Sequence, residues 1–219
     1  MLLLDKLIKA GDTVIEAGAH IGYISIYLSK LVEDAGRVYV FEPGVNNLPY
    51  TRKNLNALTN VVLVEKAVGN CNGVVPFYIE NFSGQNNSLL DNYSILSRNI
   101  KSSFLKVKTQ KTMVEVIRLD DFINERNIKP SFIKLDIEGA ELDAIKGLLT
   151  CLNNDKPKLM VEITENKQQL YDIIKKNGYV MFSNKLRVIN DYDEISPYTF
   201  SLHRDKHSDS LAELGVLPE

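Results

Sequence analysis

The sequence predicts a doubly wound α/β domain, with a mostly parallel sheet and helices on both of its faces. Short β-branched runs alternate with segments in which apolar residues recur every three to four positions. Runs such as VVLV at 61–64 are continuously apolar, as expected for strands buried on both faces of a sheet. Glycine or acidic residues follow most of these runs, where the ligand-binding loops of such a sheet are expected.

The composition fits one globular domain. The chain has 219 residues, of which 44% are hydrophobic and 25% are charged. We expect the domain to cover residues 1–203 and residues 204–219 to form a polar tail, with docking of Leu211, Leu214 and Leu217 on the domain as the alternative. The formal net charge is −2, so no basic field favours a nucleic-acid partner.

The cysteines and the apolar runs bear on where the protein works. Cys71 and Cys151 are far apart in the sequence and form no C-x-x-C pair, which argues against a disulfide framework and a cysteine zinc site. No apolar run approaches the ~18 residues of a membrane span, and the leucines at 2–4 are too few for a secretory signal. We therefore expect a cytoplasmic protein without a membrane span.

The first half of the chain predicts a β-α-β-α-β arrangement. Parallel crossovers of this kind are right-handed and place their helices on the faces of the sheet. The expected elements are a short helix at 2–8 ending near Gly11, a strand at 13–17, a helix at 20–31, a strand at 37–41, a helix at 46–58 and a strand at 61–64.

The middle of the chain is less regular. Residues 73–79 predict an extended segment, and residues 81–103 are rich in Asn and Ser without clear periodicity. A connection of that length inside a domain is usually functional. One hypothesis is a mobile lid over an acceptor, hinged at Gly84 and docking through Phe82, Leu89, Leu90 and Tyr93. The alternative is a solvated insertion without a role.

The α/β alternation returns in the second half. Apolar runs and helical periodicity again follow each other at the spacing of crossover units. The expected elements are a strand at 114–117, a helix at 119–126, a strand at 131–135, a helix at 141–149, a strand at 159–163, a helix at 168–176, a strand at 179–182 and a last strand at 198–202.

The turn after the first strand predicts a nucleotide cofactor site. Gly18 permits a tight turn with positive φ, and Gly22 permits close packing of the next helix. Glu42 ends the second strand and lies 42 − 22 = 20 residues beyond Gly22, where a carboxylate can accept hydrogen bonds from ribose hydroxyls. The residues predicted to bind the cofactor are Glu16, Gly18, Ala19, His20, Gly22, Glu42, Ala67, Val68 and Asp136.

Charge distinguishes between two kinds of cofactor. A dinucleotide site favours G-x-G-x-x-G, whereas this chain has E-x-G-x-x-x-G with Glu16 directly before the glycines. A carboxylate repels a pyrophosphate but attracts the ammonium and sulfonium groups of S-adenosylmethionine. The pattern therefore favours S-adenosylmethionine, with adenine near Ala67 and Val68. A purely structural use of these residues is the alternative.

Three stretches resemble the FkbM-type branch of the class I methyltransferases: VIEAGAHIGYISIYLSK, VYVFEPGVNNLPYTRKNL and FIKLDIEGAELDAIKGL. The resemblance spans about residues 11–182, and the K-x-D-x-E-G-A-E pattern in the third stretch is its most specific part. It implies a Rossmann-like seven-stranded sheet whose last strand is antiparallel, S-adenosylmethionine as methyl donor, and a sugar, glycan or secondary-metabolite hydroxyl as acceptor. Glu16 and His20 depart from the Asp and Asn that are usual in the family.

Acidic residues at later strand ends predict the reacting end of the site. Asp136 is the leading general base, and Glu138 and Glu162 are expected beside it as further catalytic residues. Clustered carboxylates raise one another's pKa values. The same cluster could hold Mg²⁺, an alternative that we do not favour. We expect Glu141 to be a first-turn helix residue, and Lys134 to point away from the crevice.

The function predicted from the sequence is O-methylation by an S-adenosylmethionine-dependent enzyme. One alternative is an NAD-dependent Rossmann oxidoreductase, which the missing G-x-G-x-x-G disfavours. The other is a non-catalytic protein that binds S-adenosylmethionine. His203 and His207 are expected at the surface, and Tyr23 and Phe41 in the core.

Overall fold

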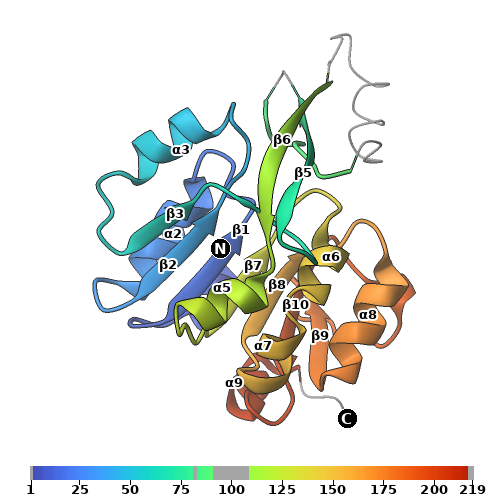
Figure 1. Ribbon diagram of the computed structural model, residues 1–219. Coiled ribbons are helices and arrows are strands. Elements are labelled where there is room, and N and C mark those ends of the chain that lie inside the picture. Colours follow the sequence, from blue (N-terminus) through green and yellow to red (C-terminus); the bar gives the residue numbers. More distant parts are fainter. Residues whose placement is uncertain (1, 81–82, 91–108, 217–219) are drawn as a thin grey trace.

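The computed structural model describes residues 2–80, 83–90 and 109–216, and a seven-stranded sheet forms its centre (Figure 1). The strands lie in the order β3-β2-β1-β7-β8-β10-β9. All neighbours are parallel except β10, which is antiparallel to both β8 and β9. This confirms the expected class I methyltransferase fold. The strands are β1 (Thr13–Ala17), β2 (Arg37–Phe41), β3 (Val61–Val64), β7 (Phe132–Leu135), β8 (Lys158–Glu162), β9 (Tyr179–Ser183) and β10 (Tyr198–His203).

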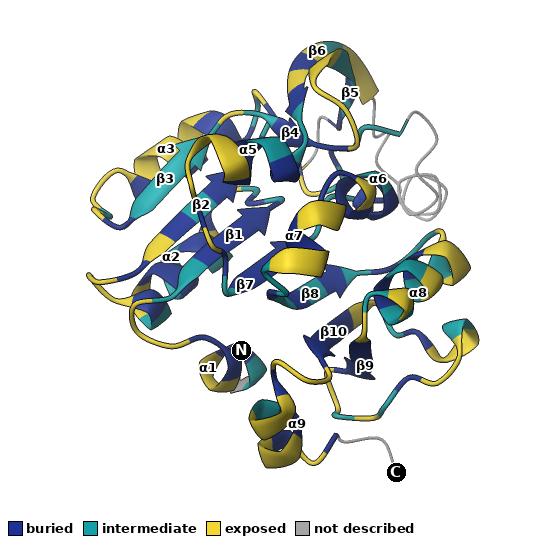
Figure 2. Cartoon of the chain, turned by 60° about the horizontal axis from the view of Figure 1, so that its bottom comes forward, coloured by how far each residue is buried: buried dark blue, intermediate teal, exposed yellow. Residues whose placement is uncertain are grey.

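Helices cover both faces of the sheet, and each face has its own apolar core. Side chains alternate between the faces, so Val14 packs into one core and its neighbour Ile15 into the other. In Figure 2 the buried strands lie between helices whose outer sides are exposed. One face carries α1 (Leu2–Leu7), α2 (Tyr23–Val32), α3 (Leu48–Leu55) and α9 (Ser208–Leu214). The other carries α5 (Leu119–Glu125), α6 (Glu141–Lys146), α7 (Leu149–Asn154), α8 (Lys167–Lys176) and the short 3₁₀ helix η1 (Tyr192–Glu194).

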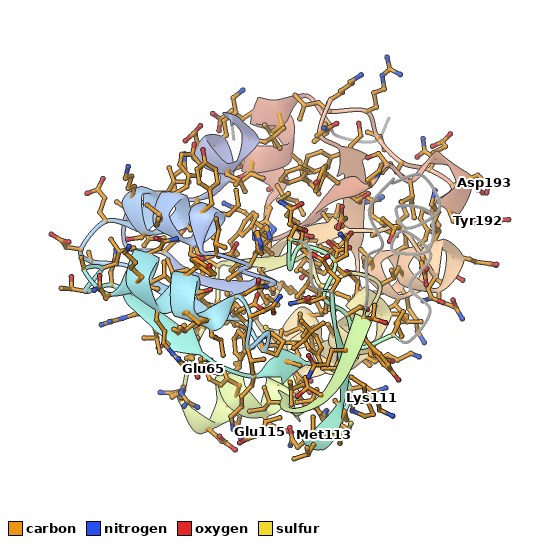
Figure 3. All side chains as sticks on the ribbon, turned by 90° about the horizontal axis from the view of Figure 1, so that it is seen from above. Glu65, Lys111, Met113, Glu115, Tyr192 and Asp193 are labelled. Carbon is orange, nitrogen blue, oxygen red and sulfur yellow. The ribbon has the colours of Figure 1, made fainter. Side chains whose placement is uncertain are left out.

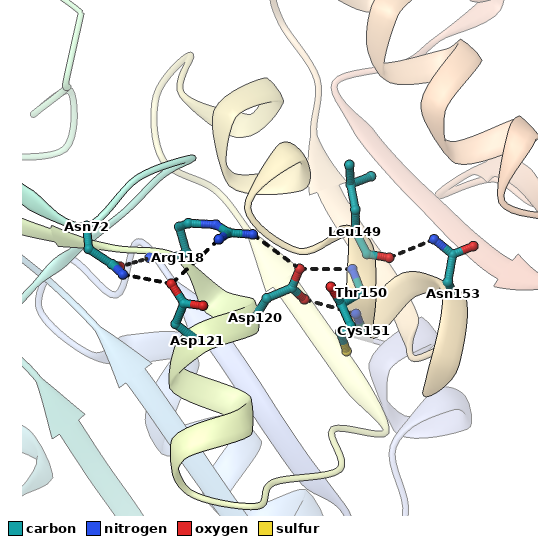
Figure 4. A network of polar contacts seen from close by, with 8 residues as sticks. All are labelled: Asn72, Arg118, Asp120, Asp121, Leu149, Thr150, Cys151 and Asn153. Carbon is teal, nitrogen blue, oxygen red and sulfur yellow. Dashed lines mark hydrogen bonds and ion pairs between the residues drawn. The ribbon is translucent and has the colours of Figure 1, made fainter.

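The helix predicted at 141–149 ends earlier than expected: α6 ends at Lys146, the chain turns at Gly147, and α7 begins only at Leu149. A Cβ on Gly147 would lie 2.1 Å from the backbone oxygen of Gly69, so the two segments pack backbone to backbone. The α7 N-terminus is capped from α5. The Asp120 carboxylate accepts hydrogen bonds from the backbone N–H groups of Thr150 and Cys151, both at 2.9 Å (Figure 4).

A second, three-stranded sheet was not predicted. It has the order β4-β6-β5, with β4 (Ala67–Val68), β5 (Gly73–Glu80) and β6 (Thr109–Ile117). The β5–β6 hairpin rises beyond the main sheet in Figure 1. Its inner face holds a small apolar cluster. On β6, every second side chain points to the exposed side, among them Lys111, Met113 and Glu115 (Figure 3).

The C-terminal segment is not the polar tail predicted from residue 204. It contains α9, whose Leu211 and Leu214 are buried against the main core. The histidines expected at the surface hold this helix in place: His203 and His207 are 5% and 9% exposed, and the His203 N–H donates to Nδ1 of His207 at 3.0 Å. Among the described residues, every helix is too short or too polar to span a bilayer.

Candidate active site

A cavity of about 540 Å³ lies at the carboxyl ends of the main-sheet strands. Its wall is made by the turn after β1, the end of β2, the small sheet, and the ends of β7 and β8. Parallel strands end at one edge of the sheet, so side chains distant in sequence meet there. The volume lies within the usual range for small-ligand sites, ~300–1,000 Å³.

The turn after β1 has the geometry that its glycines predict. Gly18 has φ +86°, and a Cβ there would lie 1.7 Å from the backbone oxygen of Asp136. Gly22 has φ +84° and packs against the Leu55 side chain of α3. Gly18, Ala19 and His20 line the cavity, whereas Gly22 supports the turn from behind. The turn therefore brings the ends of β1 and β7 into direct backbone contact.

Glu42 lines the cavity at the end of β2 and is held rigidly. Its Oε2 accepts from the His20 N–H at 2.7 Å, and its Oε1 accepts from the Gly44 N–H at 2.8 Å and from Asn47 Nδ2 at 3.2 Å. Burial raises the pKa of Glu42 to about 7 despite these donors. A carboxylate offers about four lone-pair directions, so one remains for a ligand hydroxyl.

The small sheet supplies the apolar side of the cavity. Ala67 and Val68 form β4, are buried, and line the cavity together with Phe77. Lys66 also lines it, but its ammonium is 2.6 Å from Glu115. This side can therefore hold a flat apolar group such as adenine.

Three carboxylates meet at the other end of the cavity. One oxygen each from Asp136, Glu138 and Glu162 lies within 4.8 Å of the others, and all three residues line the cavity. Asp136 and Glu162 hydrogen-bond each other, and burial together with that contact raises the pKa of Glu162 to about 9. A proton shared between the two carboxylates satisfies this pair.

Glu141 has a structural position, as predicted for a first-turn residue of α6. Its Oε1 accepts from the Ile137 N–H at 2.9 Å, and its Oε2 accepts from the Gly139 N–H at 3.1 Å. These bonds hold the turn that carries Glu138, whose φ of +57° is uncommon for a residue with a side chain. Burial raises the pKa of Glu141 to about 7.

Lys134 is placed opposite to its prediction. It lines the cavity, and its Nζ lies 3.1 Å from Asp136 Oδ2 and 3.5 Å from Glu16 Oε1. Glu16 was expected to bind the cofactor, but it is fully buried and does not line the cavity. Its Oε2 accepts from Ser25 Oγ at 2.6 Å. Glu16 can therefore act on a ligand only through Lys134 and Ser25.

The comparisons with known proteins agree with this geometry. The profile described as the methyltransferase FkbM domain matches residues 16–181. The chain belongs to the FkbM methyltransferase family. Among curated proteins, no sequence matches this family member.

Solved structures resemble this FkbM-family protein in fold. A methyltransferase FkbM from Methylobacillus flagellatus KT is 19% identical, with a TM-score of 0.57 over 87% of this chain and 43% of that chain. The present chain thus spans less than half of that relative. An rRNA methylase from Streptococcus thermophilus is 14% identical (TM-score 0.46, 91% and 90% of the two chains). A SAM-dependent O-methyltransferase from Thermotoga maritima is 12% identical (TM-score 0.49, 92% and 62%).

Residues 83–90 cover part of the cavity of this FkbM-family protein. The Glu80 carboxylate accepts from the N–H groups of Ser83 and Gly84, and the Gly84 oxygen accepts from Asn47 Nδ2 at 3.0 Å. Ser88 Oγ donates to the backbone carbonyl oxygen of Glu138 at 2.6 Å. The lid predicted at 81–103 is thus partly described; Phe82 and Tyr93 fall outside the described residues, and the lid role stays a prediction.

Two tyrosines that the sequence analysis did not assign to the site line the cavity. Tyr198 pairs with Glu162 across β10 and β8, is 42% exposed, and lines the cavity beside the carboxylates. Tyr23, expected in the core, is 65% exposed and also lines the cavity, because α2 begins at this residue. Phe41 is buried as expected. The sequence offered no signal for Tyr198, because its position beside Glu162 depends on the pairing of β10 with β8.

Proposed function

We propose that this chain transfers a methyl group from S-adenosylmethionine to a hydroxyl of a sugar, glycan or secondary metabolite. The observation that carries the proposal is the polarity of the cavity. It has a rigid carboxylate and an apolar wall on the β2 side, and a carboxylate cluster on the β7–β8 side. A nucleoside with a cationic tail matches this order of groups.

The charges of the cavity wall support the sulfonium cofactor over a dinucleotide. Within the described part of the wall, the lysines are Lys66 and Lys134, and both are already ion-paired with carboxylates. A pyrophosphate would therefore meet acidic groups without a free cation to balance it. The ammonium and sulfonium groups of S-adenosylmethionine would instead be attracted by Asp136 and its neighbours.

The assignment of contacts follows from the cavity wall. Glu42 would accept from a ribose hydroxyl, Ala67 and Val68 would contact adenine, and the turn at Gly18–His20 would approach the amino-acid tail. Glu16 would stabilise the tail indirectly through Lys134. When bound, the cofactor supplies an electrophilic methyl carbon on sulfur.

The reacting end needs an acceptor and a place for its proton. An acceptor hydroxyl beside Asp136 forms the new O–C bond while the C–S bond breaks, its electron pair stays on sulfur, and the hydroxyl proton moves to a carboxylate oxygen of Asp136. Glu138, Glu162 and Tyr198 surround that position and can hydrogen-bond further hydroxyls. A polyhydroxylated acceptor fits such a surface.

The experiment is a binding measurement followed by a methyl-transfer screen. Calorimetry should give binding of S-adenosylhomocysteine and none of NADH, which would exclude the oxidoreductase alternative. Labelled methyl donor is then offered with a panel of sugars, glycolipids and polyketide-like alcohols, with and without EDTA. Label recovered in a methyl ether of an acceptor hydroxyl supports the proposal, and transfer that EDTA does not inhibit supports a carboxylate base. Tight binding without transfer to any hydroxyl would favour the non-catalytic alternative and contradict O-methylation.

A further inference from the structure

A buried line of alternating charges runs beneath the carboxylate cluster. Lys134 lies at the centre of β7 and is 3% exposed, and Glu16 is its register neighbour on β1. The ammonium lies 3.5 Å from Glu16 Oε1 and 3.1 Å from Asp136 Oδ2. Asp136 directly follows β7, two residues after Lys134, and the ion pair shows that the two side chains lie on the same side of the chain.

The two ends of this line have different surroundings. Glu16 is fully buried, its Oε2 accepts from Ser25 on α2, and its Oε1 accepts no hydrogen bond within the described structure. Asp136 lines the cavity and also hydrogen-bonds Glu162. An unpaired buried charge costs several kcal/mol, so burial of Lys134 requires its carboxylate partners. Lys134 thus extends from the closed interior to the reacting end of the cavity.

This placement makes Asp136 and Glu162 unequal. Two carboxylates in hydrogen-bond contact share one proton, and a nearby cation decides which of them carries the negative charge. Lys134 contacts Asp136, and no ion pair joins it to Glu162 among the described residues. The charged and titratable groups that face Asp136 are Lys134, Glu138, Glu16 from β1, Glu162 from β8, Glu141 from α6 and Tyr198 from β10.

We propose that Lys134 is a positioning residue for methyl transfer: by pairing with one oxygen of Asp136, with Glu16 as its buried counter-charge, it keeps Asp136 ionised and places the shared proton on Glu162. The reaction role rests on the proposed function, whereas the charge arrangement can be measured without it. Asp136 is then the carboxylate ready to receive the acceptor proton. The pKa values agree in direction. Burial would raise the pKa of Asp136, but Lys134 and the hydrogen bond to Glu162 lower it below its usual value.

The test is a carbon-13 NMR titration of side-chain carboxyl groups in the cofactor-free, EDTA-treated protein. Signals are assigned with Asp136→Asn and Glu162→Gln. In Lys134→Met, Asp136 should titrate at least one pH unit higher than in the wild type, a tenfold change in its dissociation constant. Lys134→Arg should restore the wild-type titration. Lys158→Met is the matched control, because it removes a half-buried lysine at the opposite end of β8 and should leave Asp136 unchanged.

Two further variants protect the test against misfolding. Glu16→Gln/Lys134→Met removes one positive and one negative charge together, and Asp136 should still titrate at a higher pH than in the wild type. In Glu16→Gln alone, Lys134 has Asp136 as its remaining ion-pair partner, and the titration point of Asp136 should fall. If Asp136 titrates alike in all of these folded variants, Lys134 is only structural and the proposal is wrong. This result does not depend on detecting methyl transfer, so a failed acceptor screen would leave it intact.

Discussion

Replacing Glu42 by Gln should weaken binding of S-adenosylhomocysteine while leaving the domain folded. Gln keeps the size of the side chain and removes its charge. Three protein donors already occupy the carboxylate at 2.7–3.2 Å, which leaves about one lone-pair direction for a ribose hydroxyl. One charge-assisted hydrogen bond contributes ~1.5–3 kcal/mol, which corresponds to roughly 10- to 150-fold in affinity.

The pH dependence gives the same prediction a second measurement. The pKa of Glu42 is raised by burial to about 7, so the carboxyl is largely protonated at pH 6 and ionised at pH 8. A ligand that donates to the carboxylate favours the ionised form. Wild-type affinity, measured by calorimetry, should therefore rise from pH 6 to pH 8, and it should rise less in Glu42→Gln.

Glu65→Gln is the matched control for this experiment. Glu65 also follows a strand end, but it is exposed, pairs with Arg52, and does not line the cavity. Its affinity should stay within about twofold of the wild type. Thermal unfolding of both variants verifies that they are folded. A folded Glu42→Gln protein with wild-type affinity and wild-type pH dependence would refute the ribose assignment.

Four further predictions follow from other parts of the structure. Asp136→Asn should reduce methyl transfer ~10²–10⁴-fold while affinity for S-adenosylhomocysteine changes only a few-fold; unchanged kcat would contradict its role as base. Gly18→Ala should destabilise the domain by about 3 kcal/mol or more in urea unfolding, because its Cβ would lie 1.7 Å from the Asp136 oxygen at φ +86°, and a stable variant would mean that the turn is looser. Asp120→Ala should cost ~1–2 kcal/mol through loss of the α7 cap, and an unchanged urea midpoint would contradict that role. His207→Asn tests acid sensitivity: burial lowers the folded pKa of His207 to about 4, so the unfolded state binds its proton first and stability is lost as pH falls below about 6.5. The variant should lose roughly 1–2 kcal/mol less than the wild type between pH 7 and pH 5, and parallel curves would show that His207 is not responsible.

The main sheet was predictable because its strands are short and apolar and its crossovers are parallel. TVIEA forms β1, whose last four residues are buried between two helical layers, as expected. VVLV was wrongly expected to be buried on both faces, because it forms the edge strand β3 and its four residues are only half-buried. The small sheet was harder to predict. Residues 109–113 of β6 are largely polar and exposed, so the sequence shows only its buried end at 114–117 as a strand.

The candidate site was predictable where its residues stand at strand ends. Gly18, Glu42, Val68 and Asp136 all meet at one cavity, as parallel strands require. Lys134 was misplaced because all residues of β7 are buried. Alternation along such a strand tells which residues share a face, and the partners Glu16 and Asp136 decide which face holds the charges.

The C-terminal error has a similar cause. His203 and His207 look like surface residues in a polar sequence, yet their ring and backbone nitrogens bond locally and allow burial. Leu211 then packs into the core beside β9 and β10. A spacing of apolar residues over seven positions is too short to distinguish a docked helix from a tail without these partners.

A crystal structure of the protein with S-adenosylhomocysteine tests the central claim most directly. The account predicts ribose against Glu42, adenine against Ala67 and Val68, and the sulfur directed towards Asp136 on the β7 side of the cavity. Ribose placed away from Glu42, or the nucleoside bound outside this cavity, would contradict it.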